Sequence, residues 1–285
     1  MKSTVKNAYA KLNLFLDVTG RRDDGYHNIR SVMQTVSLSD IVAIESVFGG
    51  GIVLSDSENI KKQDNLCYIA AERFFERLKK SYGVKITLKK SIPMTAGLGG
   101  GSADAAAVLR GLNELFEYPF SVFELRKIAL KIGADVPFCV CGGTARAEGI
   151  GELIEPLSPL EGCFFTITEV KGKFSTAEAY RRLDLTGTDA KDELFDKLIS
   201  GLEAKDDIEK ISGYMYNCFE QLYNDRLFKL KELIKSLGAF KAMMSGSGLA
   251  TFGVFKTKQE ADIAADQLTK CGFVTHAAEP VKEYC

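Results

Sequence analysis

The stretch SIPMTAGLGGGSADAAAVLRGLNELF, Ser91 to Phe116, decides how the rest of this chain is interpreted. Four of its glycines, at positions 97, 99, 100 and 101, lie just ahead of an Ala-rich segment. Glycine has no side chain, so the backbone amides of such a loop can turn inward and approach a ligand closely. The helix expected after Ser102 would add the positive end of its dipole, and the stretch therefore predicts an anion-binding loop.

The helix itself is predicted by an apolar stripe at helical spacing, formed by Ala105, Leu109, Leu112 and Phe116. Ser102 is placed to cap this helix or to reach a phosphate or its metal ion. The fifth glycine, at position 111, reads as an ordinary interruption inside the helix.

Two common nucleotide motifs are excluded by what surrounds these glycines. Gly101 is followed by Ser102 rather than lysine, so the GxxxxGK(S/T) pattern of P-loop proteins is missing. The third glycine of the GxGxxG dinucleotide pattern is missing as well. A flexible linker would not be flanked by a strand and a strongly patterned helix, so we expect a phosphate-binding loop of another kind.

Length and composition indicate an ordinary globular protein of two domains. With 285 residues, 46% hydrophobic and 26% charged, the chain has enough apolar material for two cores. The prolines at 156 and 159 place the expected boundary near residue 157, giving domains 1–157 and 158–285. Mixed helices and short strands, mostly outside βαβ units, predict an α+β architecture in both halves.

Charge and cysteine usage exclude several function classes. The formal net charge of −1 provides no general field for nucleic acid or an anionic membrane. We see neither a signal segment nor a membrane-spanning run, and the seven scattered cysteines fit reduced thiols, so we predict a cytoplasmic protein. Cys139 and Cys141 are expected in a buried strand, because their spacing does not suit a zinc site.

The first strand, AYAKLNLFLDV, alternates with period two and places Lys11 and Asn13 on the same face. That face can be a solvent-exposed strand surface, which is the commoner case, or it can point two polar groups into a cavity. The early region that follows, with MQTVSL and DIVAIESV, predicts an antiparallel sheet, and residues 65–81 predict a helix.

Asp135 is a second candidate for chemistry. It follows a helix whose start is marked by the capping box of Ser121 and Glu124 and whose end is expected at Lys131, with Gly133 as its cap. Apolar neighbours suggest a partly desolvated carboxylate, which a nearby lysine would keep ionised as a base. Without further evidence, a structural role for Asp135 in a turn or at a helix cap is the more common case.

The second half is expected to begin with the strand CFFTITEV and to carry helices near residues 177–183, 192–202 and 227–237. It then closes with AFKAMM, SGSG, LATFGVF, the helix EADIAADQL and the strand GFVTHAAE. By itself SGSG, residues 245–248, predicts a simple hairpin. His27, beside Tyr26 in the turn DDGYHN, is a lone surface histidine by default or part of a pair that holds a planar base.

Taken in order, AKLNLFLDVTGRRDDGYH, PMTAGLGGGSADAAA, GADVPF with GGTA and GIGE, and SGSG resemble the GHMP kinase superfamily over nearly the whole chain. DGYH and GADVPF resemble in particular the branch that phosphorylates 4-diphosphocytidyl-2-C-methyl-D-erythritol for isoprenoid precursors. The resemblance implies an N-terminal domain of the ribosomal S5 domain 2-like type, a C-terminal GHMP kinase domain and a cleft between them. It also implies ATP, Mg²⁺ and phosphorylation of the tertiary C2 hydroxyl.

The same resemblance implies roles for individual residues. Lys11 and Asp135 match the catalytic pair. The residues that match the ATP site are Asn65, Lys90, Pro93, Met94, Thr95, Ala96, Gly97, Leu98, Gly99, Gly100, Gly101, Ser102 and Ala103. Those that match positions around the cytidine diphosphate substrate are Asn13, Tyr26, His27, Thr176 and Tyr180.

Ala103 stands where the family commonly has serine, which leaves Ser102 as the expected contact near the metal and no identified carboxylate ligand. Two alternatives stay open at this point. One is another GHMP kinase, acting on mevalonate or homoserine, against which DGYH argues. The other is a catalytically silent binding protein on the same fold, against which Lys11 and Asp135 argue.

Overall fold

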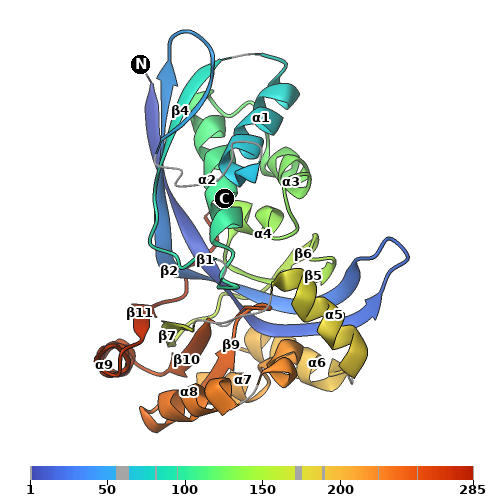
Figure 1. Ribbon diagram of the computed structural model, residues 1–285, viewed down its shortest axis with the longest axis vertical. Helices are drawn as coiled ribbons and strands as arrows, with labels where there is room; N and C mark the ends of the chain where they lie inside the picture. Colours follow the sequence, from blue (N-terminus) through green and yellow to red (C-terminus); the bar gives the residue numbers. More distant parts are fainter. Residues whose placement is uncertain are drawn as a thin grey trace.

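The computed structural model describes residues 2–55, 64–80, 82–94, 96–170, 175–187, 190–223, 225–248 and 250–284. Within these residues it contains one seven-stranded sheet, ordered β3-β4-β2-β1-β8 with β5 and β6 attached to β2, and one four-stranded sheet, ordered β11-β7-β10-β9. Helices α1 to α4 pack on one face of the first sheet, and the second sheet lies at the other end of the molecule (Figure 1). The α+β prediction is confirmed.

The first sheet and its helices consist of β1 (Ser3–Arg21), β2 (His27–Val47), β3 (Gly51–Ser55), α1 (Leu66–Leu78), β4 (Gly83–Lys89), α2 (Gly100–Leu115), α3 (Val122–Leu130), α4 (Val136–Cys141), β5 (Thr144–Gly149), β6 (Leu153–Pro156) and β8 (Tyr216–Asn217). The remaining elements are β7 (Phe164–Glu169), α5 (Thr176–Thr186), α6 (Asp192–Glu203), α7 (Ile208–Gly213), the 3₁₀ helix η2 (Cys218–Leu222), α8 (Asp225–Ser236), β9 (Lys241–Met244), β10 (Thr251–Phe255), α9 (Lys258–Lys270) and β11 (Val274–Ala278).

The long antiparallel hairpin β1–β2 is the spine of the molecule. Its two strands run from the α1–α4 layer to the region of α5 (Figure 1). Residues of these strands enter all three hydrophobic clusters, for example Ala8 in the first, Leu12 in the second and Leu16 in the third. The stretches MQTVSL and DIVAIESV, expected as separate strands, are one continuous strand, and the predicted antiparallel sheet is confirmed.

Of the two cases left open for the polar face of β1, the solvent-exposed one is not observed. Lys11, Asn13 and Asp17 are only 5%, 1% and 1% exposed, because the strand lies between the helix layer and the second sheet. Register shifts between Asn13 and Phe15 also interrupt the alternation, as a bulge does. The second case, in which Lys11 and Asn13 point together inside the protein, is the one observed.

Helix α2 begins three residues earlier than expected. Gly99 occupies the N-cap position with φ +70°, so Gly100 and Gly101 already belong to the first turn, and Ser102 makes no capping hydrogen bond. Gly111 is more than an interruption, because a Cβ at this position would lie 2.6 Å from Ile44 Cδ1 of β2. It therefore allows α2 to pack closely on the sheet.

The prediction of a buried strand that contains Cys139 and Cys141 is wrong. Their segment, VPFCVC, forms the short helix α4. Proline in the first turn suits a helix start, where no amide donor is needed, whereas it would interrupt a strand ladder. The preceding helix α3 has the predicted capping box but ends at Leu130, with Lys131 rather than Gly133 at its cap. Asp135 consequently lies at the N-terminus of α4.

In the second half, the predicted helices lie within a few residues of the expected bounds, and β9, β10, α9 and β11 follow in the predicted order, whereas α7, β8 and η2 were not predicted. The boundary at residue 157 stays a prediction. Tyr216–Asn217 of the second half pair with β1 in the first sheet, so the halves are connected by backbone hydrogen bonds. Within the described ranges, no helix is both long and apolar enough to span a bilayer.

Candidate active site

The glycine loop forms one wall of a cavity of about 820 Å³, which is within the size range of small-molecule sites. Most of the residues predicted to contact ATP line it: Asn65, Lys90, Pro93, Met94, Ala96, Gly97, Leu98, Gly99, Gly100, Gly101 and Ser102. Ala103 does not, because it is 2% exposed and packs in the first core. Thr95 lies outside the described residues.

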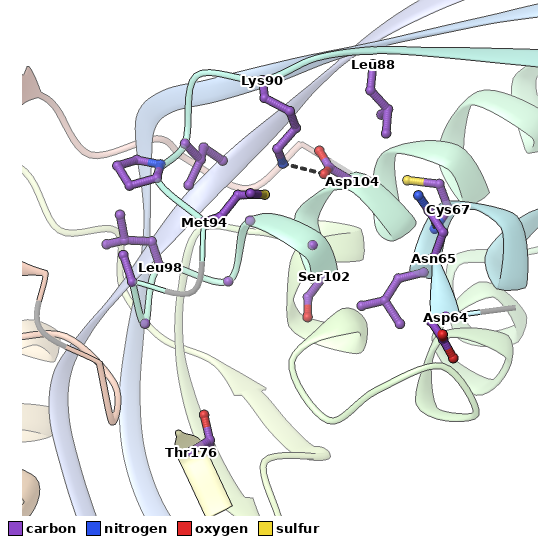
Figure 2. Close-up of a pocket in the computed structure, with 18 residues that line it drawn as sticks. Asp64, Asn65, Cys67, Leu88, Lys90, Met94, Leu98, Ser102, Asp104 and Thr176 are labelled. Carbon is purple, nitrogen blue, oxygen red and sulfur yellow. Dashed lines mark hydrogen bonds and ion pairs between the residues drawn. The ribbon is translucent and has the colours of Figure 1, made fainter. Parts of the chain in front are cut away.

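The opposite wall is built by the start of α1, where the Asn65 side chain accepts a hydrogen bond from the backbone N–H of Cys67 and caps the helix. Figure 2 shows Asn65 and Ser102 on different helices facing the same space, with Thr176 of α5 at its lower edge. Thr176 was predicted near the second substrate, and it lies at the rim of the cavity that the glycine loop forms.

The loop is held in shape by the SGSG turn. A Cβ at Gly97, whose φ is +84°, would overlap the carbonyl oxygen of Ser245, so only glycine permits this contact. The Ser245 hydroxyl donates to the Gly97 carbonyl oxygen at 3.1 Å and accepts from the backbone N–H of Asn13 at 3.2 Å. The turn between β9 and β10, predicted as a simple hairpin, thus connects the glycine loop to β1.

Lys11 and Asp135 meet beside this loop. The Lys11 Nζ lies 3.6 Å from Asp135 Oδ2 and 2.5 Å from Asn13 Oδ1. The lysine stem passes Gly99, where a Cβ would lie 2.9 Å from Lys11 Cγ. Asp135 makes no capping hydrogen bond with α4, and its side chain is 33% exposed. A buried ammonium therefore faces a carboxylate that keeps access to solvent.

Asn13 holds the ammonium in place. Its side-chain Nδ2 donates to Ser31 Oγ at 2.8 Å, and Ser31 Oγ donates to the Phe15 carbonyl oxygen at 2.7 Å. The amide oxygen is left to accept from Lys11. Because its amide nitrogen donates to Ser31 and its amide oxygen accepts from Lys11, the orientation of the Asn13 side chain is defined by the fold.

A second cation, Lys90, is shared by two carboxylates at the back of the cavity. Its Nζ contacts Asp40 and lies 2.5 Å from Asp104 Oδ2 (Figure 2). Burial raises the pKa of Asp104 to about 7, although the charge of Lys90 opposes this. Burial alone would lower the pKa of Lys90, but the two carboxylates outweigh it and raise the pKa. Asp40 also accepts from the N–H of Ser91 and Ile92, which directs the chain into the glycine loop.

The residues predicted around a second substrate are brought together only in part. The His27 ring packs against Tyr180 with centroids 4.8 Å apart, and its Nε2 lies 2.7 Å from Asp184 Oδ1. Burial, chiefly, raises the pKa of Tyr180, and the nearby Asp135 carboxylate acts in the same direction. Tyr26 is 61% exposed and does not pair with His27, so the expected Tyr26–His27 pair is replaced by His27–Tyr180.

Comparison with known proteins identifies the family. Models described as "GHMP kinases N terminal domain" and "GHMP kinases C terminal" match residues 65–143 and 199–273. A 4-diphosphocytidyl-2-C-methyl-D-erythritol kinase of Caldicellulosiruptor saccharolyticus is 42% identical over 269 residues, which are 93% of this chain and 92% of the relative. The chain belongs to the GHMP kinase family. Within this family its sequence is similar to relatives named 4-diphosphocytidyl-2-C-methyl-D-erythritol kinase.

Solved structures agree with this assignment. A crystal structure of 4-(cytidine 5'-diphospho)-2C-methyl-D-erythritol kinase superposes with a TM-score of 0.81 at 32% identity, covering 96% of this GHMP kinase and 98% of the other chain. A homoserine kinase from Cytophaga hutchinsonii gives a TM-score of 0.79 at 18% identity, with 99% and 96% covered. At that identity the second match shows the fold alone.

Several residues of this GHMP kinase that shape the site were missed by sequence reasoning. Asp40 and Asp104 surround Lys90, Ser31 orients Asn13, and Asp184 bonds His27. Each lies within a regular strand or helix, and its partner is distant in sequence. The Ala-rich run SADAAA offered one signal, since a lone aspartate on the buried side of a helix requires a cation or a donor.

Proposed function

We propose that this GHMP kinase transfers the γ-phosphate of ATP to the C2 hydroxyl of 4-diphosphocytidyl-2-C-methyl-D-erythritol, giving the 2-phosphate and ADP in the non-mevalonate route to isoprenoid precursors. The observation that carries the proposal is the placement of Lys11 Nζ 3.6 Å from Asp135 Oδ2, directly beside a glycine loop that lines a cavity of about 820 Å³. A silent binding protein would have no need of a buried lysine aimed at a solvent-accessible carboxylate.

In this proposal the glycine loop binds the phosphates of ATP through its backbone amides and the N-terminus of α2. Asp135 accepts the proton of the substrate hydroxyl as its oxygen attacks the γ-phosphorus. The new oxygen–phosphorus bond forms while the bond from the γ-phosphorus to its bridging oxygen breaks, and ADP leaves. Lys11 orients the Asp135 carboxylate, 3.6 Å from its Nζ, and offsets negative charge in the transition state. Phosphoryl transfer depends mainly on such positioning and electrostatics.

In this proposal Mg²⁺ would be held mainly by the phosphates of ATP. Within the described residues, no group of three or more His, Cys, Asp or Glu side chains could hold a metal ion. This agrees with the usual behaviour of Mg²⁺ at nucleotide sites, where phosphates and waters supply most ligands and the protein adds one or two oxygens. We assign Ser102, in the first turn of α2, as the protein oxygen nearest this ion.

The second substrate is assigned to the side of Asp135 away from the glycine loop. The rings of His27 and Tyr180, from two distant parts of the chain, are in tilted contact, and Asn13 lies beside Lys11. An exposed Tyr26 next to His27 adds an aromatic surface on which a pyrimidine base can stack. A cytoplasmic location, predicted from the sequence, fits a reaction that consumes ATP.

The test is incubation of the purified chain with ATP, Mg²⁺ and each of three acceptors: 4-diphosphocytidyl-2-C-methyl-D-erythritol, mevalonate and homoserine. We expect ADP release with the first acceptor only, and phosphorus NMR of the product should place the new phosphate on C2. Consumption of mevalonate or homoserine instead would refute the substrate assignment. An absence of ADP release with every acceptor would favour the silent binding protein.

A further inference from the structure

The segment Glu279–Tyr284 follows β11 and crosses from the second half of the chain to the first, and we call it the strap. Its backbone is bonded to β2: the N–H of Ser37 donates to the Glu279 carbonyl oxygen at 2.9 Å, and the N–H of Val281 donates to the Thr35 carbonyl oxygen at 2.8 Å. In Figure 1 the chain accordingly ends beside α2 and α4, far from α9 and β11. The strap is therefore a bonded connection between the two halves.

Tyr284 of the strap binds the C-terminal end of α4. Its hydroxyl donates to the Cys139 carbonyl oxygen at 2.9 Å, and its N–H donates to the Cys141 carbonyl oxygen at 3.0 Å. The last carbonyl groups of a helix have no partner inside the helix and must be satisfied from elsewhere. Gly142, with φ +72°, makes room for this contact, because a Cβ there would overlap the Tyr284 ring.

The Tyr284 ring is held independently of its hydroxyl. The Arg110 guanidinium lies 4.4 Å from the ring centroid, in cation–π geometry, and the ring of Tyr9 lies 5.6 Å away. The same guanidinium donates to the Asn7 carbonyl oxygen at 2.7 Å. Removing the hydroxyl alone would therefore leave the ring in place, which makes the contact with α4 separable by mutation.

Two short connections lead from the strap to the proposed catalytic pair. Cys139, whose carbonyl accepts from Tyr284, donates its own N–H to the Asp135 carbonyl oxygen at 3.2 Å. Thr35, whose carbonyl accepts from the strap, is the β2 residue paired with Lys11. Helix α4 has only six residues, so its own hydrogen bonds cannot fix its position, and external bonds at its far end matter more than in a long helix.

We infer that Tyr284 is a positioning residue: by bonding the end of α4, the strap sets the place of Asp135 relative to Lys11. This inference rests on the proposed function for its catalytic meaning, whereas the physical coupling between Tyr284 and α4 does not. Small displacements of a catalytic group cost much more in rate than in stability, with about a hundredfold loss for a shift of about 1 Å.

The experiment compares Tyr284→Phe with the matched control Tyr9→Phe. Both variants remove one hydroxyl from the same aromatic pair, but the Tyr9 hydroxyl bonds Asn7 at 3.0 Å rather than α4. In Tyr284→Phe we expect kcat to fall about tenfold with KM for ATP within about twofold, and amide exchange in residues 136–143 to accelerate about fivefold. Tyr9→Phe should match the wild type in all three quantities.

A double-mutant cycle with Asp135→Asn separates positioning from general destabilisation. If Tyr284 acts through Asp135, Tyr284→Phe has no further effect on kcat in the Asp135→Asn background. An equal loss of kcat in both backgrounds, or exchange in 136–143 no faster than in Tyr9→Phe, would overturn the inference. A wild-type chain that releases no ADP would count against the proposed function alone, because the exchange comparison would still decide the coupling.

Discussion

Gly101 offers the sharpest test of the amide cradle, because nothing in the fold itself requires glycine there. A Cβ at Gly101 would meet only Leu66 Cδ1, at 3.5 Å, which is ordinary contact, and the position carries no positive φ. The residue is exposed in the first turn of α2 and lines the cavity. The proposed function predicts instead that the side chain is missing because ATP approaches this backbone.

Gly101→Ala should stabilise the chain and weaken ATP binding. Alanine is favoured over glycine in a helix by about 0.5–1 kcal/mol, and this raises the melting temperature by about 1–2 °C in a protein of this size. In the proposed binding mode the added methyl group would displace a phosphate oxygen from this backbone, and the loss of one charge-assisted hydrogen bond, about 1.5–3 kcal/mol, would weaken ATP binding by about ten- to a hundredfold.

Calorimetric titration with ATP and thermal unfolding of the same samples measure both effects. The matched control is Gly97→Ala, in which φ +84° and the overlap with Ser245 make glycine a requirement of the fold. That variant should lose at least about 2 kcal/mol of stability. If Gly101→Ala bound ATP as tightly as the wild type, the reasoning that phosphates approach this backbone would be refuted.

Three further variants test the remaining parts of the site. Asp135→Asn should bind ATP normally but lose at least about a hundredfold in kcat, about 3 kcal/mol of barrier; steady-state turnover near the wild-type rate would remove Asp135 as the base. Lys11→Met, which keeps the volume of a side chain that is 6% exposed, should lose turnover with little change in melting temperature, whereas a collapse of the melting temperature would make Lys11 structural. Asp104 has a folded pKa of about 7 against an ordinary value of 3.8, so the stability contributed by its protonated form is lost as pH rises through about 7. Asp104→Asn should therefore flatten the fall in melting temperature between about pH 4 and about pH 7, the interval between the unfolded and folded pKa values, and an unchanged slope would contradict the raised pKa.

Local rules explain what the sequence determined correctly. The capping box of Ser121 and Glu124 and the glycine loop at residues 97–101 depend on hydrogen bonds and steric limits that act over three or four residues. Lys11 and Asn13 share a face because a strand has period two, and their contact follows from that spacing. These features could be predicted without knowing what packs against them.

Only the tertiary structure decided which of these features act together. The six-residue segment VPFCVC is too short for its apolar pattern to distinguish a strand from a helix. That it forms helix α4 depends on how it packs and on the hydrogen bonds it makes with other parts of the chain. The burial of Lys11 follows from the layers on both sides of β1, and its meeting with Asp135 follows from the placement of α4 beside that strand. Tyr284 shows the same limit, because its partner Cys139 lies far away along the chain. The sequence therefore determined the parts of the site, whereas long-range packing decided their distances.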